Sequence, residues 1–167
     1  MPRRRALLGM TILAGAGAMA LWPRRHVANA EAETATTAHF PVTHTDAEWR
    51  KLLSPAAYEI LREQGTEIPY SSPLDLETRT GIYSCLGCGQ HVYSSATKYN
   101  SYTGWPSFWK PLPGAIGESE DTSYGVDRTE VHCARCGGHL GHVFSDGPPP
   151  TGLRYCMNGA ALSFQPA

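Results

Sequence analysis

Cys85-Leu86-Gly87-Cys88 and Cys133-Ala134-Arg135-Cys136 are the two stretches that decide the fold of this chain of 167 residues. Each stretch is a C-x-x-C pair, and 44 residues separate the first pair from the second. Four thiolates can close a tetrahedral zinc site that leaves no open coordination position. The pattern therefore predicts one structural zinc ion per chain, a staple for the fold that takes no part in chemistry, with the ligands Cys85, Cys88, Cys133 and Cys136.

Two disulfides are the alternative reading of the same four cysteines. A disulfide inside a C-x-x-C pair is strained and usually redox-active. A glycine also follows each pair closely, Gly89 after the first and Gly137-Gly138 after the second. Glycine permits the tight turn that points backbone N–H groups at metal-bound sulfurs. These features favour zinc.

Short β-type runs bounded by Gly, Pro, Asn and Ser dominate the chain from residue 81 onward. Two short helices precede them, one starting at the capping box Thr45-Asp46-Ala47-Glu48 and one at Ser54-Pro55 and ending at Gly65. We predict a mainly β, mostly antiparallel domain with short N-terminal helices packed on it and a zinc staple. The expected strands cover residues 81–84, 91–95, 107–112, 123–133, 139–144, 153–158 and 161–164.

The N-terminus has the parts of an export signal. Arg3-Arg4-Arg5 precedes an apolar stretch over residues 6–22, and Ala28-Asn29-Ala30 is a small-residue cleavage site. The apolar stretch has 17 residues, three of them glycines, so it is a poor membrane span. Paired arginines before a weakly hydrophobic core predict a twin-arginine export signal over residues 1–30. An ordinary secretory signal or an uncleaved anchor is the alternative.

Export of this kind moves folded proteins, so the thiols could bind zinc before they meet an oxidising compartment. We expect an exported protein, periplasmic or secreted, without stable membrane insertion once the signal is cleaved. Residues 31–45 are small and polar and predict a flexible leader, and residues 46–167 form the domain. Residues 1–30 hold five of the 14 basic side chains and none of the 15 acidic ones, which leaves the mature chain a net charge of −6. Such an acidic domain is a poor nucleic-acid binder.

We call each C-x-x-C pair with its turn a knuckle. Cys156 stands apart from the four knuckle cysteines, in the stretch Leu153-Arg154-Tyr155-Cys156-Met157-Asn158. On a strand, Arg154, Cys156 and Asn158 share one face. A guanidinium favours the thiolate and so lowers a thiol pKa, and an amide can donate hydrogen bonds. The sequence makes Cys156 the leading candidate for a nucleophile, although a buried structural cysteine would also fit.

Two further segments accompany this cysteine. His139 and His142 lie three residues apart, so they would face opposite ways on a regular strand, and a bulge at Gly141 is needed to bring both to one site. Gly104-Trp105-Pro106-Ser107-Phe108-Trp109 is rich in aromatic side chains. Taken alone, each histidine could be structural and the aromatic cluster could be core.

These segments together resemble the type B methionine sulfoxide reductases. The likeness runs in order from about residue 46 to 165 and includes both C-x-x-C pairs and the segment from Trp49 to Glu67. Its most specific parts are Asn100 to Phe108, His139 to Pro148 and Gly152 to Asn158. The resemblance implies a β domain with two antiparallel sheets. It also implies reduction of methionine-R-sulfoxide, chiefly in oxidised proteins.

Position by position, the resemblance assigns Cys156 as the nucleophile that attacks the sulfoxide sulfur. It assigns His142 as the proton donor with His139 beside it, and Asn158 and Arg154 as the residues that hold the sulfoxide oxygen and tune the thiolate. Trp105 and Phe144 match the apolar pocket for the substrate methyl group. A leaving sulfoxide oxygen has to be protonated, so a nucleophile and an acid are both required.

Thr103 departs from the family pattern. Many members carry a second cysteine there, which resolves the sulfenic acid of the nucleophile as a disulfide. With Thr103 in that place and four cysteines assigned to zinc, we expect regeneration by an external thiol, from a thioredoxin-like protein or a small dithiol. A non-enzymatic zinc-ribbon domain and a thiol–disulfide oxidoreductase are the rival functions. The first leaves Cys156 and its neighbours without purpose, and the second needs a free C-x-x-C pair.

Overall fold

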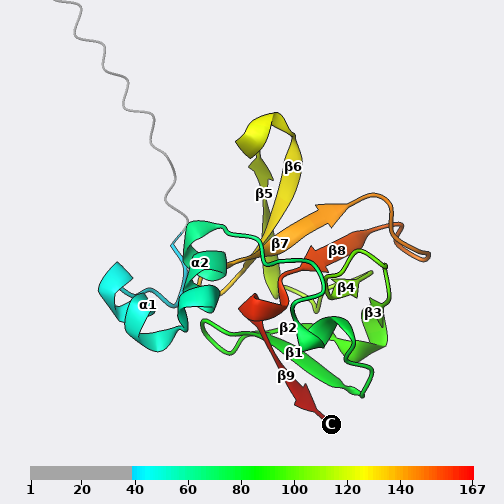
Figure 1. The fold of residues 1–167 in the computed structure, drawn as a ribbon, viewed down its shortest axis with the longest axis horizontal. Coiled ribbons are helices and arrows are strands. Elements are labelled where there is room, and N and C mark those ends of the chain that lie inside the picture. The colour runs from blue at the N-terminus through cyan, green and yellow to red at the C-terminus, as the bar shows by residue number, and fades with distance from the viewer. Residues whose placement is uncertain (1–38) are drawn as a thin grey trace, which may run out of the picture. The chain divides into compact units, whose positions relative to one another are not determined.

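A computed structural model describes residues 39–167, in which two short helices lead into a set of antiparallel strands (Figure 1). Residues 1–30, predicted as an export signal, and the first part of the predicted leader lie outside the described residues. Within residues 39–167, no helix combines the length and the apolar character needed to cross a membrane.

The two helices begin where the capping residues predict. Helix α1 (Asp46–Leu52) has Thr45 at its N-cap, and Thr45 and Glu48 form the reciprocal capping box. Helix α2 (Pro55–Glu63) has Ser54 at its N-cap. The residue that ends it is Gln64, one before the predicted Gly65, because Gln64 adopts the left-handed conformation with φ 55°. The N–H of Gly65 then bonds the carbonyl of Glu59 at 2.9 Å and closes the last turn.

The strands form two antiparallel sheets, which confirms the predicted fold class. The smaller sheet has the order β2-β1-β9. Its strands are β1 (Gly81–Cys85), β2 (His91–Ser94) and β9 (Leu162–Pro166). The chain therefore closes this sheet by pairing its last strand with its first.

The larger sheet has the order β3-β4-β8-β7-β6-β5 and carries the residues of interest. Its strands, in chain order, are β3 (Lys98–Tyr99), β4 (Ser107–Phe108), β5 (Ile116–Asp121), β6 (Arg128–Cys133), β7 (His139–Phe144) and β8 (Arg154–Met157). The hairpin of β5 and β6 projects from the body of the domain (Figure 1). Four 3₁₀ turns connect the elements, η1 (Pro73–Asp75), η2 (Ser95–Thr97), η3 (Ser123–Gly125) and η4 (Gly159–Ala161).

Four strand predictions differ from the structure. The run predicted over 123–133 is a strand only over Arg128–Cys133, because Ser123–Gly125 forms the 3₁₀ turn η3, and the two-residue strand β3 was not predicted. The run predicted over 107–112 is a strand only at Ser107–Phe108, since Pro111 and Pro113 cannot donate to a ladder. Strand β5 was not predicted, because Ile116–Asp121 is mostly polar and lacks apolar alternation. Its pairing with β6 alone makes it a strand.

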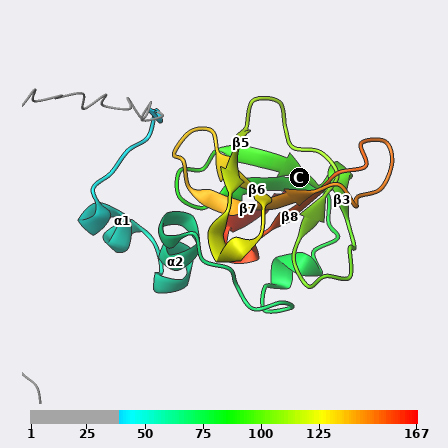
Figure 2. The same ribbon diagram turned by 90° about the horizontal axis from the view of Figure 1, so that it is seen from above.

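An aromatic core joins the sheets. Tyr83, Tyr93 and Phe108 have no exposed surface, and the rings of Tyr93 and Phe108 stack with centroids 4.3 Å apart. Leu61 of α2 and Leu140 of β7 are also fully buried in this cluster, so the second helix covers part of it (Figure 2). Each such side chain contributes about 1.5–3 kcal/mol to folding. The core holds β4, β7 and β8 in place, and the candidate active site lies on these strands.

Candidate metal centre and active site

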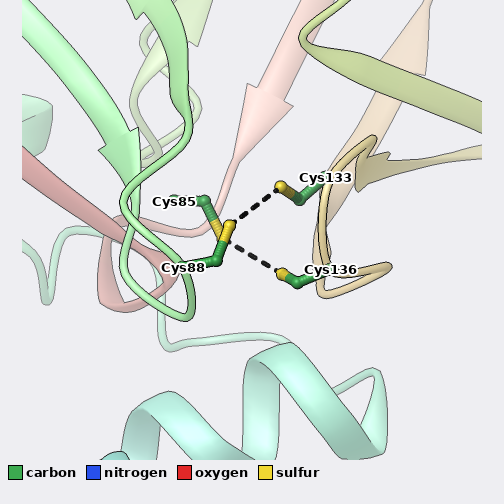
Figure 3. A group of neighbouring side chains, drawn as sticks. All are labelled: Cys85, Cys88, Cys133 and Cys136. Atoms are coloured by element: carbon green, nitrogen blue, oxygen red, sulfur yellow. Dashed lines mark hydrogen bonds between the residues drawn. The ribbon is translucent and has the colours of Figure 1, made fainter. Parts of the chain in front are cut away.

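The four knuckle cysteines meet in one cluster (Figure 3). Their sulfur atoms all lie within 4.8 Å of one another. The Sγ atoms of Cys85 and Cys136 are 3.7 Å apart, and those of Cys88 and Cys133 are 3.6 Å apart. A tetrahedron with metal–sulfur bonds of about 2.3 Å has edges of about 3.8 Å, whereas a disulfide requires about 2.05 Å. All five cysteines are free thiols. The donor set and its spacing fit a structural metal ion, and the two-disulfide alternative is wrong.

The cluster lies where the turns of two hairpins meet. The first knuckle is the turn between β1 and β2, and the second is the turn between β6 and β7. The metal would therefore join the smaller sheet to the larger one. Gly89 and Gly137 have φ of 74° and 66°, so both knuckles use the glycine turn that the sequence predicts. Arg135 Nη1 also donates to the carbonyl of Cys88 at 3.2 Å, which links the two turns directly.

The segment before α1 packs on the second knuckle. The N–H of Val42 donates to the carbonyl of Arg135 at 2.9 Å. A Cβ at Gly137 would lie 2.3 Å from the ring of Phe40, so this ring covers the knuckle closely. Phe40 and Val42, within the stretch predicted as the end of a flexible leader, thus pack against the second knuckle.

Cys156 lies on β8, between β4 and β7 in the larger sheet. It is directly opposite His142 on β7 and Ser107 on β4. Directly opposed side chains lie on the same face with Cβ atoms about 4.5–5.5 Å apart. The structure therefore brings the predicted nucleophile and the predicted proton donor together from positions 14 residues apart.

Arg154 and Phe144 form the next opposed pair on the same face. The guanidinium carbon of Arg154 lies 4.4 Å from the ring centre of Phe144. Its Nε and Nη2 donate to the two carboxylate oxygens of Asp146 at 2.9 and 3.0 Å. This bidentate contact and the ring together fix the guanidinium beside Cys156.

A bulge in β7 brings the second histidine to the same site. Gly141 pairs with Val131, but His139 pairs with His132, so Leu140 is an extra residue in β7. A Cβ at Gly141 would lie 2.1 Å from the carbonyl oxygen of Cys156, which explains why the bulge contains glycine. The rings of His139 and His142 have centroids 5.3 Å apart. The predicted bulge is confirmed.

Each histidine is held by a carboxylate that the sequence analysis did not identify. His139 Nδ1 is 2.8 Å from Glu130 Oε1, and His142 Nε2 is 2.7 Å from Asp121 Oδ2. Hydrogen bonds from His132 and His139 hold the pKa of Glu130 well below its usual range. Hydrogen bonds from Ser123 and His142 do the same for the pKa of Asp121. Both carboxylates are therefore ionised acceptors at neutral pH.

The two imidazoles differ in their surroundings: burial shifts the pKa of His142, whereas His139 has a ring nitrogen without a hydrogen-bond partner in the described part of the chain. Burial lowers the pKa of His142, and the hydrogen bond to Asp121 offsets only part of that effect. His139 is 2% exposed, and its Nε2 is buried without a hydrogen-bond partner in the described part of the chain. Because Glu130 takes Nδ1, the free nitrogen of His139 is available for a water or a substrate atom.

Asn158 lies one residue beyond β8 and is 3% exposed. Its Nδ2 donates to the carbonyl of Leu140 at 3.2 Å, and its Oδ1 accepts from the N–H of Glu67 at 3.0 Å. The indole N–H of Trp105 donates to the carbonyl of Glu67 at 3.1 Å. One residue thus fixes both Asn158 and Trp105.

Glu67 is itself anchored by its side chain. Its carboxylate oxygens accept from the backbone N–H groups of Gly159 and Ala160 at 2.6 and 2.8 Å, at the start of η4. In the sequence, Glu67 is the last residue of the segment starting at Trp49 that shares the family likeness, and nothing there predicts a role for it. No local pattern could identify it, since its partners lie about 90 residues away in the chain.

Cys156 has hydroxyl groups and a cation as neighbours. Its Sγ is 3.9 Å from Thr103 Oγ1, and Ser101 Oγ lies 2.8 Å from Thr103 Oγ1 and 2.7 Å from Ser107 Oγ. Burial raises the pKa of the Cys156 thiol. Arg154 and the hydroxyls of Thr103 and Ser107 act in the opposite direction. Arg154 therefore lowers the pKa of Cys156, as the sequence predicts, but desolvation raises that pKa by more.

Comparisons with known proteins place this arrangement in a family. A family model described as the SelR domain matches residues 53–166. A peptide methionine sulfoxide reductase MsrB of Agrobacterium fabrum is 52% identical over 126 residues, which cover 75% of this chain and 93% of that protein. Proteins of the same name from Leptospira interrogans and Thiobacillus denitrificans are 49% identical over 128 residues and 54% identical over 123 residues. These alignments cover 76% and 73% of this chain and 98% and 93% of the relatives, respectively.

Proposed function

This chain belongs to the type B methionine sulfoxide reductases, enzymes that reduce methionine-R-sulfoxide, and we propose that Cys156 performs the reduction through a sulfenic acid. The observation that carries the proposal is the direct pairing of Cys156 with His142 across β7 and β8. It places an acid beside a nucleophile on one rigid face, which is what sulfoxide reduction requires. Both strands are interior strands of the larger sheet, so their geometry is fixed before substrate binds.

The thiolate of Cys156 attacks the sulfoxide sulfur, and protonated His142 supplies a proton to the oxygen as the S–O bond breaks. This attack forms an S–S bond and leaves the methionine sulfur as a sulfonium and the oxygen as hydroxide. The hydroxide then attacks the Cys156 sulfur, and the S–S bond breaks with its electron pair going to the methionine sulfur, so Cys156 ends as a sulfenic acid. Methionine leaves as the thioether. The net result is the transfer of one oxygen atom from the substrate to Cys156, which converts one thiol and one sulfoxide into one sulfenic acid and one thioether.

The remaining predicted residues orient the substrate in this scheme. Asn158 and Arg154 hold the sulfoxide oxygen and favour the thiolate, and His139 lies behind His142 with its free Nε2. Trp105 and Phe144 receive the methyl group of the substrate. The hydrogen bonds of Asn158 and the bidentate contact of Arg154 support these roles, since both side chains are held in one orientation.

Regeneration of Cys156 needs an external thiol in this proposal. Thr103 is the side chain next to the nucleophile, and the other four cysteines belong to the metal cluster. A thioredoxin-like protein or a small dithiol would attack the sulfenic acid, release water and then reduce the mixed disulfide.

The metal in the cluster is zinc in this proposal, one ion per chain. Four thiolates in a closed tetrahedral arrangement are the structural zinc donor set. The ion would hold the two knuckles together and would leave no coordination position for substrate.

We place the working protein outside the cytoplasm, in the periplasm or secreted, on the basis of residues 1–30. An exported repair enzyme would act on oxidised proteins in a compartment that lacks the reducing thiols of the cytoplasm. Replacing Arg4-Arg5 by Lys-Lys should retain the precursor inside the cell, measured by fractionation. Unchanged export of that variant would mean a general secretory signal.

The deciding experiment offers purified mature protein the R and S epimers of a methionine sulfoxide peptide with a small dithiol as reductant. We expect turnover of the R epimer alone and its loss in Cys156→Ser, because a hydroxyl is a far weaker nucleophile. Zinc content and the unfolding midpoint of that variant should match the parent. Turnover of the R epimer by a correctly folded Cys156→Ser protein would refute the assignment.

A further inference from the structure

Three large apolar side chains stand out on the surface beside the nucleophile. Ile68, Tyr70 and Tyr102 are 76%, 68% and 81% exposed. Ile68 follows Glu67, whose carbonyl holds Trp105, and Tyr102 precedes Thr103, which contacts Cys156. We call Ile68, Tyr70 and Tyr102 the apolar rim. Two chain segments that are distant in sequence thus present apolar surface at the edge of the same site.

The rim is held in place rather than loosely exposed. The N–H of Tyr70 donates to the carbonyl of Gly104 at 2.7 Å, and its hydroxyl donates to the carbonyl of Tyr102 at 2.9 Å. Tyr70 and Tyr102 both adopt positive φ, 63° and 59°. A non-glycine residue in this region costs about 1–2 kcal/mol, and such strain persists where the surrounding structure enforces it. The fold therefore bears a cost to hold two exposed aromatic side chains at the edge of the site.

We propose that the apolar rim binds the residues that flank methionine sulfoxide in a polypeptide substrate, and that it favours apolar flanks. The inference rests on the proposed function of Cys156. Residues one and two positions from the oxidised methionine lie within about 3.3–7 Å of it along an extended chain. A polypeptide that presents its sulfoxide to Cys156 must therefore pass over the surface next to Thr103 and Trp105, where the rim lies.

The expected preference of the rim for apolar flanking residues follows from where methionine lies in native proteins. Methionine is among the residues most often buried, so its neighbours are frequently apolar as well. Oxidation makes its side chain polar and disrupts the core around it. The segment that becomes accessible then carries an oxidised methionine between apolar residues. Exposed Ile and Tyr side chains would bury those neighbours and raise the affinity for such a segment.

The test compares three substrates that carry the same R-sulfoxide, first with a small dithiol as reductant and then with a thioredoxin-like protein in its place. The first is a blocked single residue, the second a pentapeptide with Leu on both sides, and the third the same peptide with Ser flanks. The variants are Ile68→Thr, Tyr102→Asn and the double variant. Asn tolerates positive φ better than other polar residues, so Tyr102→Asn keeps the backbone conformation. Leu52→Thr, at a 61% exposed position at the end of α1, is the matched control.

We expect the double variant to lower kcat/KM for the Leu-flanked peptide about tenfold, since two partly buried apolar contacts are lost. Values for the single residue should stay within about twofold, because that substrate does not reach the rim. The Ser-flanked peptide should change little, and Leu52→Thr should behave as the parent with all three.

An equal fall for all three substrates would overturn the proposal, because the rim would then support the nucleophile itself. An effect that appears only when a thioredoxin-like protein replaces the dithiol would also overturn it, since the rim would be a surface for the reductant. If the parent enzyme reduces none of the substrates, the proposed function fails first, and the two failures are therefore distinguishable.

Discussion

The cluster of four cysteines and the proposed nucleophile Cys156 place the same kind of atom, a thiol sulfur, in opposite surroundings. Cys85 and Cys133 are fully buried, and each knuckle sulfur has other sulfurs as neighbours. Cys156 is only partly buried and faces an imidazole, a guanidinium and two hydroxyls. A thiolate among thiolates is satisfied by a metal ion, whereas a thiolate beside an acid can attack and be protonated in turn. Reactivity is therefore set by the neighbours of each sulfur.

The comparison predicts its largest effect at the metal cluster. Cys85→Ser should lose the metal and lower the free energy of unfolding by about 3 kcal/mol or more, because structural zinc contributes directly to folding. Cys156→Ser should keep the metal content and the stability of the parent while losing activity. Metal analysis and denaturant unfolding of both variants measure the contrast. A Cys85→Ser protein that melts like the parent but lacks activity would contradict a purely structural cluster.

The second prediction concerns what the lone sulfur does after one turnover. With R-sulfoxide and no reductant, the enzyme should convert about one equivalent and stop with Cys156 as sulfenic acid, because no neighbouring thiol can displace its hydroxyl. Mass spectrometry after blocking free thiols detects that product. A disulfide between Cys156 and a knuckle cysteine, with metal release, would break the separation between the two regions.

Thr103→Cys sharpens the same point. The Thr103 hydroxyl lies 3.9 Å from the Cys156 sulfur, so a thiol there would be close enough to attack the sulfenic acid with a small movement. The variant should end its first turnover with a disulfide between the introduced thiol and Cys156, and it should change which reductants sustain activity.

The third prediction uses pH. The thiol pKa of Cys156 is raised by burial and the pKa of His142 is lowered by burial, so the reactive pair, thiolate and imidazolium, is a minor form at every pH. Its population is flat between the two pKa values, falls below the histidine value as the thiolate is lost, and falls above the thiol value as the imidazolium is lost. The first-turnover rate should follow this bell shape in rapid-mixing experiments.

His142→Ala removes the acid and should slow the first turnover about 10²–10⁴-fold. The residual rate should keep rising with pH through the thiol pKa, since only thiolate formation remains. Arg154→Met should move that rise to higher pH, because the guanidinium lowers the pKa of Cys156. A bell shape retained in His142→Ala would assign the acid to another group.

The smallest predicted effect is at Glu67. Glu67→Ala removes the carboxylate that accepts from Gly159 and Ala160, and should lower kcat about tenfold by loosening Asn158. Glu67→Gln keeps one acceptor oxygen and should recover part of kcat. KM should change less than kcat in both, which steady-state assays with a small dithiol can measure. Loss of folding in Glu67→Ala with full activity in Glu67→Gln would indicate a structural role alone.

The local sequence pattern was sufficient to predict β-type runs and the helix starts that have N-capping residues. The β-type run over residues 139–144 was predicted with the bounds of β7, and the three-residue spacing of its two histidines predicted the bulge. Thr45 and Ser54 marked both helix starts. Strand β5 could not be predicted, because its polar residues become a strand only through their partner β6.

The residues that carry the chemistry of the site could be predicted from the sequence, but the carboxylates that hold its histidines could not. Cys156, His142 and Arg154 lie in short motifs, so their roles could be proposed from the sequence. Asp121 and Glu130 reach the two histidines only because of the register of β5, β6 and β7, and no local sequence pattern shows that register. The positions of such carboxylates depend on which strands pair.

The pairing of β1 with β9 joins the two strands of the domain that lie farthest apart in sequence. Cys85 pairs with Leu162, and Gly81 with Pro166. The middle strand β1 therefore has one partner nearby in sequence, β2, and one about 80 residues away, β9. Contacts this distant in sequence form late and slowly. The hairpin of β1 and β2 carries the first knuckle and is local, whereas the other edge of β1 stays unpaired until β9 adds to it.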